Sequence, residues 1–402
     1  MGNDFLSERI LNLPESATIQ MTRKSRELKA MGKNIITLSI GEPDFNTPEE
    51  IKKAAIDAIN NNITHYPPVA GFTEVRKAIA SKLKRDNGLD FRFDQIVISN
   101  GAKQSIANLF MVLLNKGDEV LIPAPYWVTY PAFVMMAEGV PVMINGKMEN
   151  DFKITPEQLE ASITPKTKAF LLNSPGNPTG SVYSYDELKA LAEVLKKYPD
   201  IVIVSDEIYE LILFEGKHES IAQFEELKDR VVVINGVSKG FAMTGWRIGY
   251  AASSLPLANA MNKWQSQYTS GPSSISQMAA LQAFKIDPKK DATLKNMVDT
   301  FRTRRDSLIE WLKEIPGVKT NVPKGAFYVL PDFKHYIGKR AGDHLIKDTD
   351  DLCLYLLEKA HVAVVPGVAF GSPGHVRISY ATATPLIKEA VSRMKKALME
   401  LQ

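Results

Sequence analysis

Residues 231–250 read VVVINGVSKGFAMTGWRIGY, two apolar runs joined by a polar loop. The runs at 231–234 and 248–252 are mainly apolar, as strands covered on both faces of a sheet are. The loop between them carries Lys239 and Arg247. A lysine just beyond a buried strand can be desolvated and act as a nucleophile, and an arginine can bind a phosphate through two hydrogen bonds. Taken singly, each is more often an ordinary surface charge.

The pattern of buried strands extends through the middle of the chain. Helical patterns at 103–114 and 186–197 lie between apolar runs, and this alternation predicts an α/β fold with a mainly parallel sheet flanked by helices. Four further runs predict buried strands: 96–99, 119–122, 169–172 and 201–205.

The two ends of the chain differ from the middle. A charged helical stretch ends at Gly32, and a long charged helix is predicted over 292–314, followed by short strand-like runs at 326–330 and 362–365. We expect these parts to form a second, smaller α/β domain. The expected division is 1–45 (N-terminal part of the small domain), 46–290 (large, cofactor-binding domain) and 291–402 (C-terminal part of the small domain).

Composition excludes several classes of protein. The 402 residues are 45% hydrophobic and 24% charged, with a net charge of +3, which is ordinary for a globular protein and too balanced for a nucleic-acid-binding surface. The single cysteine, Cys353, excludes a disulfide framework. Asp4 and Glu8 interrupt any signal sequence, and no apolar stretch suits a membrane helix, so we expect a cytoplasmic protein without membrane contact.

Motifs of other enzyme classes are missing from the sequence. The six histidines show no metal-ligand spacing, and we expect no metal site. The GxGxxG turn of nicotinamide-dependent dehydrogenases is absent. A transcription regulator built on a similar ligand-binding fold needs a DNA-binding head, and residues 1–45 are too short for one.

Polar side chains follow the predicted strands, where ligands of open α/β sheets bind. Residues 99–104 combine small residues with a helix start, which exposes N–H groups to an anion. Trp127 can stack on a planar ligand, and the Pro- and Gly-rich loop 173–180 can aim the amide of Asn177. Asp206, at the end of a strand, could bind a pyridinium nitrogen or a metal, or cap the next helix.

Taken together, these strand ends supply an amine, an acid, an aromatic face and a set of phosphate donors. Pyridoxal phosphate requires all four, for its aldehyde, its pyridine nitrogen, its ring and its phosphate. The sequence therefore predicts a pyridoxal-phosphate site.

The motifs that carry a family resemblance span nearly the whole chain. On them the sequence resembles the fold-type I, class I aminotransferases, close to the bacterial aspartate aminotransferases. They are Gly41–Phe45, Tyr66–Pro68, Asn173–Gly180, Ser205–Tyr209, Ser238–Tyr250 and Arg377–Tyr380. In this family the peptide bonds that match those before Pro125 and Pro178 are often cis.

The resemblance implies catalytic roles for several residues. Lys239 would attach the cofactor and move a proton between substrate and cofactor, and Asp206 would keep the pyridine nitrogen protonated. Tyr209 and Asn177 would hydrogen-bond the cofactor's phenolic oxygen, while Trp127 would stack on the ring. The residues implied to surround the phosphate are Gly101, Ala102, Lys103, Ser238 and Arg247.

The resemblance also implies how substrates and subunits meet. Arg377 would bind the substrate α-carboxylate, with a backbone contact from Gly41 and further substrate contacts from Trp127 and Asn177. Lys103 would read a distal carboxylate; the alternative is a solvated lysine at a helix start. Tyr66 would reach the phosphate of a neighbouring subunit, so a homodimer with shared active sites is expected.

The predicted activity is ping-pong transfer of the amino group between L-aspartate and 2-oxoglutarate, giving oxaloacetate and L-glutamate. The alternatives are an aromatic, alanine or broad-specificity aminotransferase, or a pyridoxal-phosphate-dependent C–S lyase. Pro14 and Glu15 stand where some relatives carry a basic residue, which argues against prephenate as a substrate. The only other partners expected are the small-molecule substrates, amino acids and 2-oxo acids.

Overall fold

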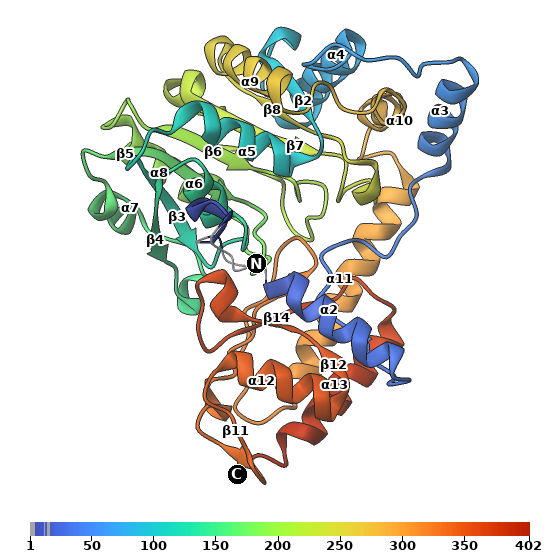
Figure 1. The fold of residues 1–402 in the computed structure, drawn as a ribbon, viewed down its shortest axis with the longest axis vertical. Coiled ribbons are helices and arrows are strands. Elements are labelled where there is room, and N and C mark those ends of the chain that lie inside the picture. Colours follow the sequence, from blue (N-terminus) through green and yellow to red (C-terminus); the bar gives the residue numbers. More distant parts are fainter. Residues whose placement is uncertain (1–4, 12, 14–16) are drawn as a thin grey trace.

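The computed structural model describes residues 5–11, 13 and 17–402, and its centre is a seven-stranded sheet (Figure 1). Only β8 runs antiparallel to its neighbours β2 and β7, while all other adjacent pairs are parallel, so the predicted mainly parallel sheet is confirmed. In spatial order the strands are β2 (Ile96–Ser99), β8 (Gly249–Ala252), β7 (Val231–Gly236), β6 (Val202–Asp206), β5 (Thr167–Asn173), β3 (Glu119–Ala124) and β4 (Val140–Asn145).

Both faces of this sheet are covered by helices because successive strand residues are apolar on both sides. In β2, Ile96 and Ile98 join one core and Val97 joins the other. One core includes residues of α5 (Ala102–Leu113), α6 (Tyr130–Met136) and α9 (Leu255–Tyr268). The other includes residues of α3 (Glu49–Asn60), α4 (Thr73–Lys82), α7 (Pro156–Ser162), α8 (Tyr185–Lys196) and α10 (Ser274–Lys285).

The predicted elements of the middle region are present with small shifts at their ends. All six predicted strands occur, and the helices predicted at 103–114 and 186–197 are α5 and α8. Strand β4 was not predicted. It lies at the sheet edge and only Ile144 of its six residues is buried, so it lacks the continuous apolar run of the central strands.

A second group of elements lies beside the sheet domain and draws on both ends of the chain (Figure 1). Strand β1 (Ile36–Thr37) pairs in parallel with β12 (Val362–Ala363), far away in the sequence. A three-stranded antiparallel sheet contains β13 (Val365–Pro366), β14 (Val376–Ser379) and β9 (Tyr328–Val329). The accompanying elements are α2 (Ala17–Ala30), α12 (Thr349–Tyr355), α13 (Thr384–Leu398) and the hairpin β10 (Arg340–Ala341) and β11 (His344–Leu345), whereas the short helix α1 (Glu8–Leu11) is seen apart from them in Figure 1.

The long helix α11 (Ala292–Lys313) runs between the two groups in Figure 1. It matches the helix predicted over 292–314. The exact division of the chain after residues 45 and 290 stays a prediction. Among the described residues, no helix has both the length and the apolar character needed to cross a bilayer.

Candidate active site

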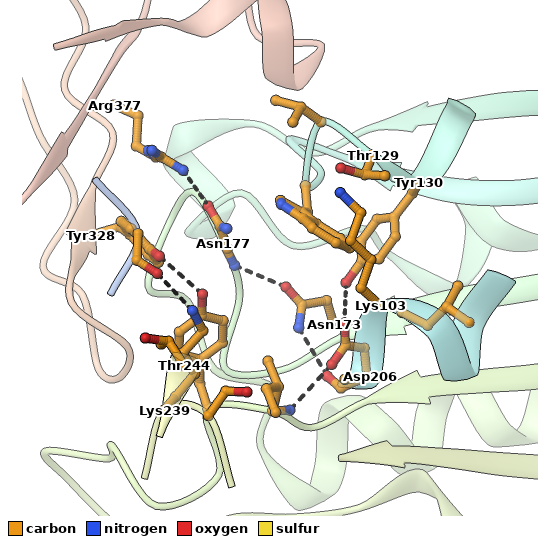
Figure 2. Close-up of a pocket in the computed structure, with 18 of the residues that line it drawn as sticks. Lys103, Thr129, Tyr130, Asn173, Asn177, Asp206, Lys239, Thr244, Tyr328 and Arg377 are labelled. Carbon is orange, nitrogen blue, oxygen red and sulfur yellow. Dashed lines mark hydrogen bonds between the residues drawn. The ribbon is translucent and has the colours of Figure 1, made fainter. Parts of the chain in front are cut away.

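A cavity of about 310 Å³ lies beyond the carboxyl ends of the central strands, against the second group of elements (Figure 2). It brings together residues that are far apart in the sequence. The predicted site residues that line it are Gly41, Ala102, Lys103, Trp127, Asn177, Asp206, Tyr209, Ser238, Lys239, Arg247 and Arg377.

Lys239 follows β7 and points into this cavity. Its Nζ donates a hydrogen bond to the Gly41 carbonyl oxygen at 2.6 Å and lies 5.9 Å from the centre of the Tyr209 ring. Burial lowers the pKa of Lys239 to about 8; the charge of Glu42 opposes this shift, whereas that of Arg247 adds to it. A substantial fraction of the amine is therefore neutral near pH 8, the form needed for attack on a carbonyl.

Asp206 ends β6 at the floor of the cavity and is only 3% exposed. Tyr130 Oη donates to its Oδ2 at 2.6 Å, and the Ile208 amide donates to Oδ1 at 3.2 Å. Burial raises the pKa of Asp206 to about 6, while these two hydrogen bonds work in the opposite direction. The carboxyl is thus mostly ionised at neutral pH, which places a buried negative charge at the cavity floor.

The loop after β5 holds Asn177 in place. Asn173 Nδ2 donates to the Asp206 carbonyl oxygen at 2.9 Å, and Asn173 Oδ1 accepts from the Asn177 amide at 2.9 Å (Figure 2). The peptide bonds before Pro125 and Pro178 are cis, as the resemblance implied, and so is the bond before Pro175.

Arg377 enters the cavity from β14 and is 2% exposed. Its Nη1 donates to Asn177 Oδ1 at 3.2 Å and its Nη2 to the Ser39 carbonyl oxygen at 2.6 Å. The guanidinium also lies 4.8 Å from the ring centre of Tyr328 and 4.9 Å from that of Phe370. Burial lowers the pKa of Arg377, but a guanidinium stays charged in proteins. Its partners among the described residues are neutral, so it suits a carboxylate ligand.

The turn into α5 and Arg247 form one wall of the cavity. Gly101 has φ +84°, and a Cβ atom there would lie 2.5 Å from Arg247 Nη2, so this approach requires glycine. Gly101 lies against Arg247 and is not among the residues that line the cavity, and its expected place beside the phosphate stays a prediction. Arg247 donates to the carbonyl oxygens of Thr244 and Asn100 at 2.9 and 3.1 Å. Together with the free N–H groups at the start of α5, this wall can bind an anion.

Lys103, in the first turn of α5, lines the cavity (Figure 2), and so does Trp127. Lys103 Nζ is 5.4 Å from the centre of the Trp127 ring, and its side chain remains exposed. Partial burial, followed by the charge of Arg247, lowers the pKa of Lys103. Lys103 thus lies where the cavity meets solvent. This position fits both interpretations, a contact with the substrate and a solvated lysine.

Tyr66 is the predicted site residue that lies elsewhere. It is 97% exposed and lines a separate hollow with Pro67 and residues 271–275. Its expected contact with the phosphate in a neighbouring subunit stays a prediction.

Comparison with known proteins decides the family. The family model for aminotransferase class I and II matches residues 33–394. This chain belongs to the class I and II aminotransferases. It is 47% identical to the aspartate/prephenate aminotransferase of Nitrosomonas europaea, over 98% of this chain and 99% of the relative. It is also 47% identical to the aspartate aminotransferase of Bacillus subtilis, over 97% and 98% of the two chains.

Solved structures agree with this assignment. The aspartate aminotransferase of Rhizobium meliloti superimposes with a TM-score of 0.95 at 44% identity, over 99% of both chains. That of Thermus thermophilus with maleate gives 0.92 at 41% identity, over 98% of this chain and 99% of the other. The fold expected from the resemblance, that of a fold-type I aminotransferase, is therefore confirmed.

Several residues of this aminotransferase cavity were given no role in the sequence analysis, and four of them stand out. Tyr130 binds Asp206, Asn173 aligns Asn177, the Tyr328 hydroxyl lies 3.0 Å from that of Tyr209, and Ile19 of α2 lines the cavity. Of these four, Tyr130 could best have been predicted from the sequence, because it follows Trp127 by only three residues and begins a helix.

The argument against prephenate rested on Pro14 and Glu15, which lie outside the described residues. It stays untested by the structure, and relatives of this aminotransferase carry prephenate in their names.

Proposed function

We propose that this aminotransferase uses pyridoxal phosphate and moves the amino group between L-aspartate and 2-oxoglutarate, giving oxaloacetate and L-glutamate. One observation carries the proposal. A lysine with a pKa of about 8, a buried carboxylate and two arginines without described carboxylate partners share one cavity. These are the groups that an aldehyde, a pyridine nitrogen, a phosphate and a substrate carboxylate would each need.

The residues present fit the cofactor. Asp206 offers a buried anion for a protonated ring nitrogen, and Trp127 offers an aromatic face. Arg247, Ser238 and the start of α5 at Ala102 offer phosphate donors on one wall. When bound, pyridoxal phosphate withdraws electrons from the substrate Cα and carries the amino group between the two substrates.

Lys239 is the proposed catalytic base and covalent anchor. Its Nζ is buried and partly neutral, so it would attach the cofactor's aldehyde and, as a free amine, would take a proton from the substrate Cα. Asp206, kept ionised by Tyr130 and the Ile208 amide, would hold a proton on the ring nitrogen. Tyr209 and Asn177 would donate hydrogen bonds to the cofactor's phenolic oxygen.

Charge supports dicarboxylic substrates. The cations Lys103, Lys239, Arg247 and Arg377 line the cavity with the single buried carboxylate of Asp206. Arg377 would bind the α-carboxylate that the amino acid and the oxo acid share, beside the backbone of Gly41, and Lys103 would bind the distal carboxylate. The names of the relatives, aspartate and aspartate/prephenate aminotransferase, point to the same substrates.

We further propose a homodimer in which Tyr66 completes the phosphate site of the neighbouring subunit. Its side chain is almost fully exposed beside a hollow formed by residues 271–275, as expected for a group whose partner lies on another chain. A cytoplasmic location accompanies this proposal.

Absorbance of the purified protein with pyridoxal phosphate tests the assignment. We expect a visible band that disappears when L-aspartate is added and returns with 2-oxoglutarate. A band that responds only to aromatic or neutral amino acids, or elimination of a thiol from a sulfur amino acid, would replace the substrate assignment. A protein with no band would refute the role of Lys239.

Prephenate is the second candidate substrate, favoured by the names of relatives at 47% identity. The same assay with prephenate in place of 2-oxoglutarate tests it. Return of the band would show that Pro14 and Glu15 do not prevent its use.

A further inference from the structure

The turn that carries Asp206 and Tyr209 also carries two buried glutamates. Asp206 and Tyr209 line the cavity, whereas Glu207 and Glu210 do not line it. Both glutamates are nevertheless at least nine-tenths buried. Because a buried carboxylate is costly unless it is paired, the partners of these two groups decide what they do.

Glu207 is held at the β6 end of the turn. Ser205 and Ser220 donate to its Oε1 at 2.8 and 2.5 Å, and His218 Nε2 lies 2.9 Å from Oε2. Burial acts against the charged imidazole, but the adjacent Glu207 outweighs it and raises the pKa of His218.

Glu210 is held at the other end by Lys82, the last residue of α4, and by Asn87, at the end of the helical turn that follows it. Lys82 Nζ donates to Glu210 Oε1 and to Asn87 Oδ1, and Asn87 Nδ2 donates to Glu210 Oε2 at 2.8 Å. The Lys82 side chain is 5% exposed. Burial would raise the pKa of Glu210, but Lys82 and His218 outweigh it, so the pKa is lowered and the pair is charged.

The side chains of Lys82, Glu207, Glu210 and His218 form one compact group. Ligand atoms of Glu207, Glu210 and His218 all lie within 4.8 Å of one another, close enough to hold a cation. The ammonium of Lys82 already lies against Glu210 and serves as that cation. Each of the two buried glutamates therefore has a basic partner within the chain.

We propose that Lys82 is a positioning residue, which fixes the turn 206–210 from behind so that Asp206 and Tyr209 point into the cavity. The two anchors, at Glu207 and Glu210, leave the residues between them little freedom to move. The part of the proposal that concerns the cofactor rests on the proposed function, in which Asp206 and Tyr209 contact pyridoxal phosphate.

The test compares Lys82→Met with Lys153→Met. Lys153 is a matched control, since it is buried and paired with Glu187 at 2.6 Å, and neither residue lines the cavity. Three quantities are measured: hydrogen exchange of amides 205–210 in the cofactor-free protein, the dissociation constant for pyridoxal phosphate, and the melting temperature. We expect both variants to melt earlier, but only Lys82→Met to exchange these amides faster and to weaken cofactor binding by about tenfold or more.

Equal exchange and equal cofactor affinity in the two variants would refute the positioning role and leave Lys82 a purely structural residue. If Lys82→Met does not fold, Glu210→Gln keeps the shape of the side chain and is expected to give the same faster exchange and weaker binding; unchanged values would refute the proposal. A wild-type protein that fails to bind pyridoxal phosphate would overturn the proposed function, and the cofactor part of this proposal with it. The exchange data would still decide whether Lys82 fixes the turn.

Discussion

The two sides of the turn 206–210 handle buried charge in opposite ways. Behind the turn, the Lys82 ammonium and the His218 imidazole each contact a carboxylate. On the cavity side, Lys239 and Arg377 donate to backbone carbonyls and an amide, with no carboxylate partner among the described residues. Charges that are balanced within the chain stabilise the scaffold, whereas the unbalanced ones mark where a charged ligand must bind.

This difference has an energetic basis. Breaking a buried ion pair typically costs about 3–5 kcal/mol, because one charge is left without a partner. The cavity of the cofactor-free protein carries such unpartnered charges already. We therefore expect substitutions in the cavity to impair function and spare stability, and substitutions behind the turn to reduce stability.

Replacing Lys239 with alanine is expected to have the largest effect. Because its amine is the only proposed covalent anchor and base, kcat/KM for aspartate should fall by at least about a thousandfold. Steady-state kinetics measure this. Lys196→Met, which removes a half-buried lysine from a surface ion pair, is the control and should retain activity. Comparable activity in the Lys239 variant would overturn its role.

Arg377→Lys should be next in size. Lysine keeps the charge but loses the two-pronged geometry that a carboxylate matches, and we expect about a hundredfold loss in kcat/KM. The KM values for the amino acid and the oxo acid should both rise, since each presents an α-carboxylate. A rise for only one of the two substrates would contradict a shared binding site.

Lys103→Ala should have a smaller and selective effect. If Lys103 Nζ binds the distal carboxylate, kcat/KM should fall by about tenfold for aspartate and change little for alanine or phenylalanine. Parallel assays with the three amino acids measure this selectivity. An equal change for all of them would favour the solvated lysine over a substrate contact.

Asp206→Asn tests the difference between the two sides of the turn by its effect on the free energy of unfolding. The pKa of Asp206 is about 6 in the folded protein against 3.8 ordinarily, so its stabilising contribution is present below pH 4 and is lost as pH rises through 6. Removing this charge should stabilise the cofactor-free protein by at most about 3 kcal/mol at pH 7 and reduce activity. Denaturant unfolding from pH 4 to 8 measures the effect. A variant that is less stable than wild type at pH 7 would contradict the reasoning.

Much of the fold could be predicted from the sequence because the central strands are buried on both faces. Their continuous apolar runs are unambiguous, whereas the exposed edge strand β4 and the two-residue strand β1 carry no such signal. The reversed direction of β8 also has no local signature, since pairing direction depends on the connection and not on the residues of the strand.

The site was predictable to the extent that its residues follow strands. Asp206 and Lys239 stand at or just beyond strand ends, and the strand-end rule places them together. Tyr130 and Ile19 reach the cavity from helices, and Tyr328 from a short strand of the second group, so only the packing of distant elements reveals them. The contacts of Lys82 and His218 with the two buried glutamates could not be predicted either, because α4 and the loop containing His218 are far apart in the sequence.

The pairing of β1 with β12, together with the place of Arg377 on the last strand, bears on how this protein is made. Chains emerge from the ribosome N-terminus first, and domains tend to fold as they emerge. The sheet that leads to Lys239 can form while the end of the chain is still being synthesised, but Arg377 and β12, the partner of β1, come last. We therefore expect newly made chains to pass through a stage in which Lys239 is in place and Arg377 has not yet reached the cavity.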